Sequence, residues 1–323
     1  MSRSEHVVFM PPNWIGDVIM AQPAMLAIAE HHHDAVISVC GRSWLQDLIP
    51  YLGIDRASYE PSLPQADIAY LFPNSFRSAW QCCQAGIRQR IGYRGQWRRF
   101  LLTRPLPHRL SLKNQHHRLF YLDIANQMGI PVSSSDVKLS APAGALEEGR
   151  NIMARHGLDP ERVICLAPGA QFGGAKCYPA ACYAEVAETL SAAGWQILIL
   201  GMDNDRDTGE TILQGVKTAH WNAAGQTSLG QALQLIAACR LMLCNDSGFM
   251  HVAAGLGKPT VAPFGATDPE RTSPSGAHVQ IIYRPAACSP CLQRECHVAG
   301  HPCMTNIAPH LLANACLAML PHP

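Results

Sequence analysis

The chain has 323 residues, of which 48% are hydrophobic and 15% charged, and its formal net charge is +1. Because a typical domain has ~150 residues, we expect two domains. The composition excludes an intrinsically disordered chain and a small module held together by disulfides, and the near-zero charge argues against a general nucleic-acid coat.

The first half of the chain alternates strands and helices. Short apolar runs predict strands, and amphipathic runs predict helices. In chain order we expect a strand at 7–10, a helix at 18–30, strands at 36–39, 68–72 and 91–93, and a helix at 114–128. We interpret His31, His32 and His33 as a solvated helix end. Residues 131–144, rich in Ser, Pro, Ala and Gly, predict the start of a linker.

The second half repeats the same alternation. We expect a strand at 163–167, a glycine-rich loop to 174, a helix at 180–193, a strand at 196–200, a helix at 229–238, a strand at 241–244, a helix at 249–256, a strand at 260–264 and a closing helix at 309–320. The sequence therefore predicts an α/β protein of two Rossmann-like domains, residues 1–145 and 146–323. Such sheets bind ligands at the carboxyl ends of their strands, so we expect a cleft there.

Positive charge is concentrated in one stretch. Residues 68–122 contain no Asp or Glu, whereas the rest of the chain has 15 basic and 24 acidic residues. The ten basic residues of this stretch are Arg77, Arg88, Arg90, Arg94, Arg98, Arg99, Arg104, Arg109, Lys113 and Arg118. They predict a face that attracts a polyanionic or membrane-borne partner, with scattered solvated arginines as the alternative.

The sequence also predicts the cellular location of the protein. The first apolar run is too short for a signal peptide, and no apolar stretch reaches the ~18 residues of a membrane-spanning helix. Thirteen cysteines, mostly in apolar surroundings, suit reduced thiols better than a disulfide framework. We therefore expect an intracellular location.

Two loops of the second half have the features of a diphosphate site. Asp246, Ser247 and Gly248 follow a strand and open a helix, where free amides and the helix dipole favour phosphate and where Asp246 can accept hydrogen bonds from a sugar. An ordinary N-capped turn is the alternative. Gly169 and Ala170 begin the second loop, which ends at Lys176 and lacks the pattern of an ATP-hydrolysing P-loop. Lys176 is either a counter-charge for a diphosphate or a solvated lysine.

In the first half, Asp17 ends the loop after the first strand, within the run Asn13, Trp14, Ile15, Gly16 and Asp17. A carboxylate at that position can act as general base on a hydroxyl. The alternative is an ordinary acidic residue that complements a helix N-terminus.

Taken together, these motifs resemble glycosyltransferase family 9, the ADP-heptose:lipopolysaccharide heptosyltransferases. The resemblance spans nearly the whole chain and includes residues 73–79, 92–95 and 245–254. It implies a GT-B fold in which the N-terminal domain binds the acceptor and the C-terminal domain binds ADP-heptose. It further implies an inverting transfer to the lipopolysaccharide inner core, without a cofactor for catalysis, by a protein peripheral to the cytoplasmic face of the inner membrane.

The resemblance assigns roles to particular residues. Asp17 would deprotonate the acceptor hydroxyl, and Lys176 would hold the departing ADP. The donor-binding set is Gly169, Ala170, Asp246, Ser247, Gly248 and His251, where a core histidine is the alternative for His251. The acceptor-binding set is Asn13, Trp14, Gly16, Asn74, Ser75, Arg77 and Arg94. The sequence departs from the family at Gln171, where an acid is usual, and at Cys177, where a basic residue is frequent, so we leave Gln171 out of the catalytic set.

A cysteine-rich segment, residues 288–303, needs a separate interpretation. Cys288, Cys291, Cys296 and Cys303 are spaced closely enough for a closed structural zinc or iron site, with free thiols as the alternative. A cysteine-bound iron would resemble the protein-modifying heptosyltransferases of the autotransporter kind.

Three alternatives to transfer onto lipopolysaccharide stay open. One is transfer of heptose to a protein serine, and another is a non-catalytic module that binds an ADP-sugar. The third, a nucleotide-sugar epimerase, has the two-domain outline but lacks these motifs.

Overall fold

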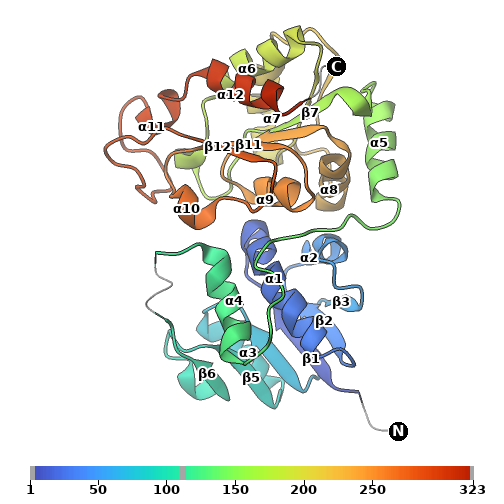
Figure 1. Ribbon diagram of the computed structural model, residues 1–323, viewed down its shortest axis with the longest axis vertical. Coiled ribbons are helices and arrows are strands. Elements are labelled where there is room, and N and C mark those ends of the chain that lie inside the picture. The colour runs from blue at the N-terminus through green and yellow to red at the C-terminus, as the bar shows by residue number, and fades with distance from the viewer. Residues whose placement is uncertain (1–3, 110–113, 321–323) are drawn as a thin grey trace. The chain divides into compact units, whose positions relative to one another are not determined.

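The computed structural model describes residues 4–109 and 114–320 and is shown in Figure 1. The chain divides into two compact units between Ser140 and Ala141. We placed the boundary after residue 145 from the sequence. It lies earlier because helix α5 (Ala145–Arg155) packs against helix α8 (Leu229–Ala238) and so belongs, from its first residue, to the second unit.

The described part of the first unit contains a six-stranded parallel sheet with strand order β3-β2-β1-β4-β5-β6. Its strands are β1 (His6–Met10), β2 (Val36–Cys40), β3 (Ala57–Glu60), β4 (Ile68–Leu71), β5 (Gln89–Tyr93) and β6 (Arg104–Leu106). Its helices are α1 (Ile15–His31), α2 (Leu45–Leu48), α3 (Phe76–Gln84) and α4 (His117–Gln127), with 3-10 turns η1 (Ile49–Tyr51) and η2 (Arg99–Leu101). Helices α1 and α4 lie side by side (Figure 1).

The second unit has the same kind of sheet, six-stranded and parallel among its described residues, with order β12-β11-β10-β7-β8-β9. The strands are β7 (Val163–Ala167), β8 (Gln196–Ile199), β9 (His220–Asn222), β10 (Leu241–Cys244), β11 (Thr260–Phe264) and β12 (Val279–Tyr283). The helices besides α5 and α8 are α6 (Ala180–Ala192), α7 (Arg206–Leu213), α9 (Gly248–Gly255), α10 (Pro269–Thr272), α11 (Pro302–Thr305) and α12 (Pro309–Ala318). The 3-10 turns are η4 (Pro160–Arg162), η5 (Gly174–Lys176) and η6 (Asp203–Asp205).

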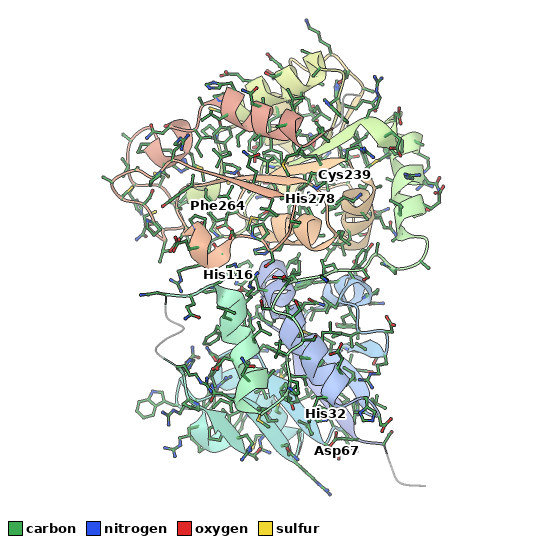
Figure 2. The ribbon with its side chains drawn as sticks, viewed as in Figure 1. His32, Asp67, His116, Cys239, Phe264 and His278 are labelled. Carbon is green, nitrogen blue, oxygen red and sulfur yellow. The ribbon has the colours of Figure 1, made fainter. Side chains whose placement is uncertain are left out.

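The central strands are buried as expected for parallel sheets. Strands β4, β7, β10 and β11 are buried along their whole length, because helices cover both faces of such a sheet. Cys239 and Phe264 are fully buried side chains in the second unit (Figure 2). The outermost strands β3 and β12 are only partly buried and have mixed composition. Each unit thus has a continuous core crossed by central, apolar strands.

The strands and helices that we expected from the sequence are confirmed, with ends shifted by at most a few residues. The sequence analysis missed the outer strands β3, β6, β9 and β12 and several helices, among them α3, α5 and α7. The missed strands are short or only partly buried, and the three helices are rich in polar residues, so none of these elements has the apolar run on which the prediction depended.

The interpretation of the three histidines as a solvated helix end is wrong for His32. Its ring nitrogens contact Glu5 Oε2 at 2.7 Å and the Tyr70 hydroxyl at 3.0 Å, and its side chain is 11% exposed (Figure 2). His31 packs edge-on against the ring of His32. His32 therefore ties the end of α1 to the sheet.

Arg98, which we counted in the basic face, is fully buried. Its guanidinium donates to the carbonyl of Tyr93 at 2.8 Å, to the carbonyl of Ser75 at 3.1 Å and to Asn74 Oδ1 at 3.2 Å, and also to the carbonyl of Pro73. Burial lowers the pKa of Arg98 to about 10, so the group remains cationic at neutral pH. Arg98 therefore holds the loop after β4 against the loop after β5.

We expect Arg98→Lys to lower the free energy of unfolding by about 2 kcal/mol or more. A lysine cannot satisfy acceptors arranged around a planar guanidinium, and each buried acceptor left without a partner costs about 1–3 kcal/mol. Urea unfolding measures the change. Arg99→Lys, at the exposed neighbouring position, is the matched control and should change stability by less than about 0.5 kcal/mol. Equal stability of the two variants would contradict this role for Arg98.

Candidate functional site

The predicted site residues lie in loops at the carboxyl ends of strands. In the first unit these loops follow β1, β4 and β5, and in the second they follow β7 and β10. Parallel strands place such loops along one edge of a sheet, so each unit gathers its own set of polar groups. We describe the second unit first.

Lys176 forms an ion pair in a mostly buried environment. The alternative of a solvated lysine, which the sequence analysis left open, is therefore not what the structure shows. Its Nζ lies 2.6 Å from Asp246 Oδ2, with the two side chains 13% and 6% exposed. Asp246 Oδ2 also accepts a hydrogen bond from Thr267 Oγ1 at 2.5 Å, and the ring of Phe172 lies 4.9 Å from the ammonium. The ammonium has three protons, so the bond to Asp246 leaves two for an anion. Asp246, expected to contact a sugar, is engaged with Lys176 and Thr267.

The loop after β10 is anchored by Asn245, which is fully buried. Asn245 Nδ2 donates to the carbonyl of Pro168 at 2.5 Å, and Oδ1 accepts from the Tyr178 amide at 3.0 Å and the Tyr183 hydroxyl at 3.1 Å. This amide therefore fixes the loop after β10 relative to the loop after β7. The Asp246 and Lys176 side chains meet across that junction.

Ser247 and Gly248 form the start of helix α9. Ser247 is the N-cap residue, and its side chain does not cap the helix. Its hydroxyl is buried and has no partner among the nitrogen and oxygen atoms of the described residues, with the Cys244 thiol as neighbour. The first-turn amides lie at the positive end of the helix dipole, which is where a phosphate binds. His251, one turn further along, is buried.

Gly169 lies in close contact with the side chain of Asp205. A Cβ there would overlap the carboxylate of Asp205, which accepts a hydrogen bond from the Met202 amide at 2.8 Å. Ala170 beside it is half-buried. The sequence analysis missed Asp205, because the residue at the N-cap of this turn is Met202 and the segment carries no recognisable capping motif. Asp205 thus links the loop after β8 to the loop after β7.

The cysteine-rich segment packs on the loop that carries Lys176. The Ala175 amide donates to the carbonyl of Arg294 at 2.9 Å, and the Gly174 amide donates to Glu295 Oε1 at 3.3 Å. His301 Nε2 donates to the carbonyl of Ala175 at 3.0 Å. These contacts could not be predicted from the sequence, because about 120 residues separate the partners. The segment therefore supports the lysine loop directly.

Gly173 makes this contact possible. Its φ of +148° is a conformation that other residues rarely adopt, and a Cβ would overlap the backbone of Arg294. The Arg294 guanidinium also lies 5.5 Å from the ring of Phe172. The glycine-rich character of the loop is thus explained by close packing against the cysteine-rich segment.

The four cysteines of this segment differ in burial. Cys303 is buried, whereas Cys288 is exposed and Cys291 and Cys296 are half-buried. Burial raises the pKa of the Cys303 thiol, and the other three thiols contribute to the same shift, so they lie within electrostatic reach. Among the described residues, no group of three or more His, Cys, Asp or Glu side chains could hold a metal ion. The zinc or iron therefore stays a prediction of the sequence.

In the first unit, Asp17 lies in the first turn of α1 and is half-buried. The hydroxyl of Tyr121, on α4, donates to Asp17 Oδ1 at 3.1 Å. Burial, and then the charge and hydrogen bond of Asp17, hold the pKa of Tyr121 well above its usual value, so the hydroxyl keeps its proton and donates it to the hydrogen bond. The ring of Phe72 packs against Tyr121. The sequence analysis missed Tyr121, for which no local motif exists.

The predicted acceptor residues differ in their exposure and in their contacts. Asn13, Trp14, Arg77 and Arg94 are exposed, and Gly16 lies half-buried in the first turn of α1. Asn74 and Ser75 are engaged by Arg98, and the Ser75 hydroxyl caps α3 by accepting from the Ser78 amide at 3.2 Å.

The basic face is smaller than the sequence predicted. Besides the buried Arg98, Arg90 donates to the carbonyls of Leu101 and Ile87, and Arg109 and Arg118 pair with Asp123 and Asp136. Lys113 lies outside the described residues. Five arginines of this stretch are exposed and form no ion pair with a described residue: Arg77, Arg88, Arg94, Arg99 and Arg104.

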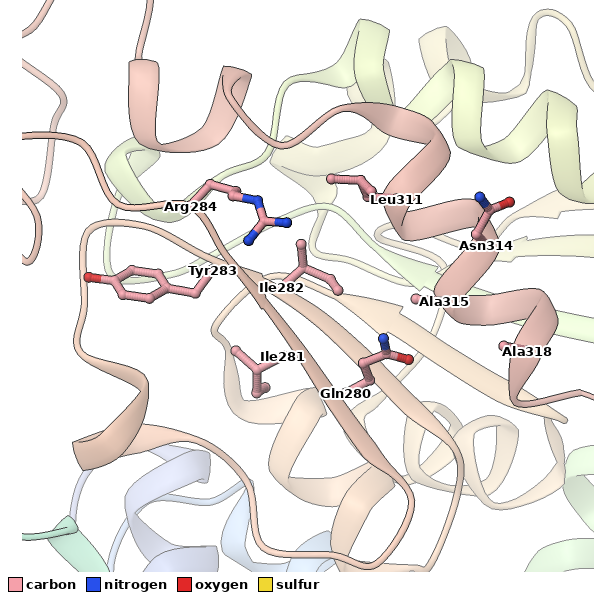
Figure 3. Close-up of a pocket in the computed structure, with 9 residues that line it drawn as sticks. All are labelled: Gln280, Ile281, Ile282, Tyr283, Arg284, Leu311, Asn314, Ala315 and Ala318. Carbon is pink, nitrogen blue, oxygen red and sulfur yellow. The ribbon is translucent and has the colours of Figure 1, made fainter.

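A hollow of about 480 Å³ lies elsewhere, between the edge strand β12 and helix α12 (Figure 3). It is lined by Gln280, Ile281, Ile282, Tyr283, Arg284, Leu311, Asn314, Ala315 and Ala318. None of the predicted site residues lines it, so it is distinct from the loops described above.

Comparison with known proteins identifies the family of the chain. Residues 62–301 match glycosyltransferase family 9 (heptosyltransferase). Lipopolysaccharide heptosyltransferase 2 of Escherichia coli strain K12 is 33% identical over 306 residues, which cover 85% of this chain and 87% of that protein. The chain belongs to glycosyltransferase family 9. It is a glycosyltransferase, as the motifs around Asp17, Lys176 and Asp246 predicted.

Solved structures of the family share the fold. The structure of E. coli ADP-heptose lps heptosyltransferase II matches with a TM-score of 0.80 and 28% identity, covering 98% of each chain. A family 9 glycosyl transferase from Veillonella parvula matches with a TM-score of 0.81 and 20% identity, covering 98% of this chain and 97% of that one. The expected GT-B fold is therefore confirmed. Within the described residues, no helix has the length and apolar character needed to cross a bilayer.

The metal prediction is tested by elemental analysis. If the cysteines hold a metal, protein purified without chelator contains about one zinc or iron per chain, and Cys291→Ser releases it, because a closed site needs all its ligands. Since the segment supports the lysine loop, we expect the same variant to lower the melting temperature and to weaken donor binding. Cys83→Ser, at a half-buried cysteine of the first unit, is the control. Metal well below one per chain, with an unshifted melting temperature for Cys291→Ser, would leave the four as ordinary thiols.

Proposed function

We propose that the protein is an inverting heptosyltransferase that moves heptose from ADP-heptose to the inner core of lipopolysaccharide, at the cytoplasmic face of the inner membrane. The observation that carries the donor half of this proposal is the Lys176–Asp246 pair beside the start of α9. A cation and a set of helix N-terminal amides in adjoining loops suit a diphosphate. The relatives named above supply the heptose and the lipopolysaccharide.

The proposed chemistry divides between the two units. In the first, the Asp17 carboxylate takes the proton of the acceptor hydroxyl, whose oxygen attacks the anomeric carbon and inverts it. In the second, the bond from that carbon to the ADP oxygen breaks, and Lys176 and the amides of α9 stabilise the negative charge that develops on the diphosphate. In this proposal every role in the step is taken by Asp17, Lys176 and the amides of α9.

Tyr121 is the positioning residue for the base. Its hydroxyl fixes the orientation of the Asp17 carboxylate by a hydrogen bond to one oxygen, Oδ1. The proton of the acceptor hydroxyl then passes to the carboxylate without a change of the tyrosine's own protonation, because its pKa is held well above the working pH. The acceptor itself is recognised by the exposed polar groups of the same unit, among them Asn13 and Arg94.

The acceptor half of the proposal is supported by charge. Inner-core lipopolysaccharide carries carboxylates and phosphates, and the first unit exposes arginines without nearby acids in the sequence. Transfer to a protein serine has no such support. Incubation of the purified protein with ADP-heptose and either heptose-deficient core or a candidate protein, read by mass spectrometry, separates these alternatives and a non-catalytic sugar-binding module.

For the base, we expect Asp17→Asn to lower kcat by about 10²-fold or more while leaving the Kd of ADP nearly unchanged. General base catalysis typically contributes 10²–10⁴ in rate, and ADP contacts the other unit in the proposal. Steady-state kinetics and ADP titration calorimetry measure both quantities. Asp47→Asn, at another acidic residue near a helix start of the same unit, is the control. A matching loss of ADP affinity would make Asp17 a donor-site or folding residue.

For the lysine, we expect Lys176→Met to weaken ADP binding by about tenfold or more and to lower kcat as well. The substitution removes the cation and leaves the nearly buried Asp246 carboxylate facing the diphosphate, which adds repulsion to the lost attraction. Lys217→Met, at an exposed lysine of the same unit, should leave both values within twofold. If Lys176→Met bound ADP as the wild type does, the diphosphate would lie elsewhere.

A further inference from the structure

The first unit has an exposed patch of aromatic and arginine side chains, of which only Arg77 was assigned to acceptor binding above. We name it the aromatic–arginine patch, and its members are Phe76, Arg77, Trp80, Trp97, Arg99 and Phe100. Of the five exposed Phe and Trp side chains among the described residues, four belong to it. Trp97 is 91% exposed and Phe100 is 73% exposed. Folded monomers rarely leave such large apolar groups together in water without a partner.

Three of the four aromatic rings form a connected surface on two elements, and Trp97 lies near Phe100 in the sequence. On α3, the rings of Phe76 and Trp80 are stacked with centroids 6.3 Å apart. The Phe76 ring also contacts that of Phe100 on η2, at 6.2 Å. The apolar area therefore runs from the helix to the 3-10 turn.

The outward direction of these side chains is imposed by the fold. Arg98 is buried and bound to the loop that precedes α3, so its chain neighbours Trp97 and Arg99 are left on the outside. The backbone at Trp97 has a φ of +59°, which a bulky residue rarely adopts. The surrounding structure thus holds the indole in water although this backbone conformation is unfavourable for a tryptophan.

The charge of the patch defines its partner. Arg77 and Arg99 are exposed, form no ion pair with a described residue, and lie in the stretch without Asp or Glu. A flat cationic surface with protruding Trp and Phe rings suits the interface of an anionic bilayer, where rings sit at the level of the headgroups and arginines pair with lipid phosphates. A soluble oligosaccharide would not need this much exposed apolar surface.

We propose that the aromatic–arginine patch binds the surface of an anionic lipid bilayer and holds the first unit against it. This inference deepens the proposed function and rests on it for its biological meaning, since a lipid-linked acceptor resides in such a bilayer. The patch adjoins the acceptor loop, because Arg98 hydrogen-bonds Asn74 and Ser75 just before Phe76 begins α3. Docking there brings the membrane next to the loop that we assign to the acceptor.

Vesicle co-sedimentation of the full chain tests the proposal without donor or acceptor. We expect the protein to bind vesicles of phosphatidylethanolamine and phosphatidylglycerol at least tenfold more tightly than vesicles of phosphatidylcholine, with affinity falling as salt rises. Arg77→Gln with Arg99→Gln should weaken binding about fivefold for each arginine. Trp97→Ser with Phe100→Ser should weaken it by about tenfold or more, since both rings lose their place in the interface.

Matched controls come from exposed residues outside the patch. Leu146→Ser, which is 44% exposed on α5, and Arg162→Gln, exposed on η4, should bind the vesicles as the wild type does. A second readout is transfer to a deacylated, water-soluble acceptor, on which Trp97→Ser with Phe100→Ser should keep its kcat/KM within twofold. Circular dichroism confirms that each variant is folded.

Three results would overturn the proposal. The first is that the wild type binds anionic and neutral vesicles equally well. The second is that the patch variants bind vesicles as the controls do. The third is that the aromatic variants lose transfer to the soluble acceptor but keep their vesicle binding. The last result would make the patch part of the acceptor site. Absence of heptose transfer by the wild type would instead refute the proposed function and leave the vesicle result intact.

Discussion

The direction of the strands is the constraint on which the rest of the molecule depends. In each unit every neighbouring pair of described strands is parallel, so every strand must be followed by a crossover and all carboxyl ends lie along one edge of the sheet. The loops after β7, β8 and β10 therefore meet without any local preference of their own. The Lys176–Asp246 pair exists because two such loops, 70 residues apart in sequence, end side by side.

Single polar groups, two of them fully buried, then hold these loops in shape. Arg98 joins the loops after β4 and β5, Asn245 joins the loops after β7 and β10, and Asp205 fits against Gly169. Arg98 and Asn245 each satisfy two or more backbone carbonyls or amides that would otherwise be left without partners, and Asp205 accepts from the Met202 amide. These loops are polar and rich in glycine in the sequence, and in the structure side-chain hydrogen bonds hold their conformation.

The sequence predicted the central strands, the two-domain organisation and the loops that carry the site, because buried parallel strands leave long apolar runs and their loops carry Gly, Asn and Asp. Contacts between distant residues could not be predicted in this way. Tyr121 on Asp17 and Thr267 on Asp246 have no sequence signature, since only tertiary packing brings them together. Arg98 shows the opposite failure, because a charge count treats every arginine as solvated, whereas this one lies in the core.

The contact between the lysine loop and the cysteine-rich segment has a consequence for the order in which the chain matures during synthesis. The bonds from Gly174 to Glu295 and from His301 to Ala175 close chain segments of 121 and 126 residues. Domains generally fold as units, from the N-terminus onward, as the chain leaves the ribosome. The first unit can complete its core early, whereas the lysine loop must wait, unsupported, until nearly the whole polypeptide has been made. A nascent chain that stops short of its last thirty residues would therefore contain a finished first unit and an unfinished lysine loop.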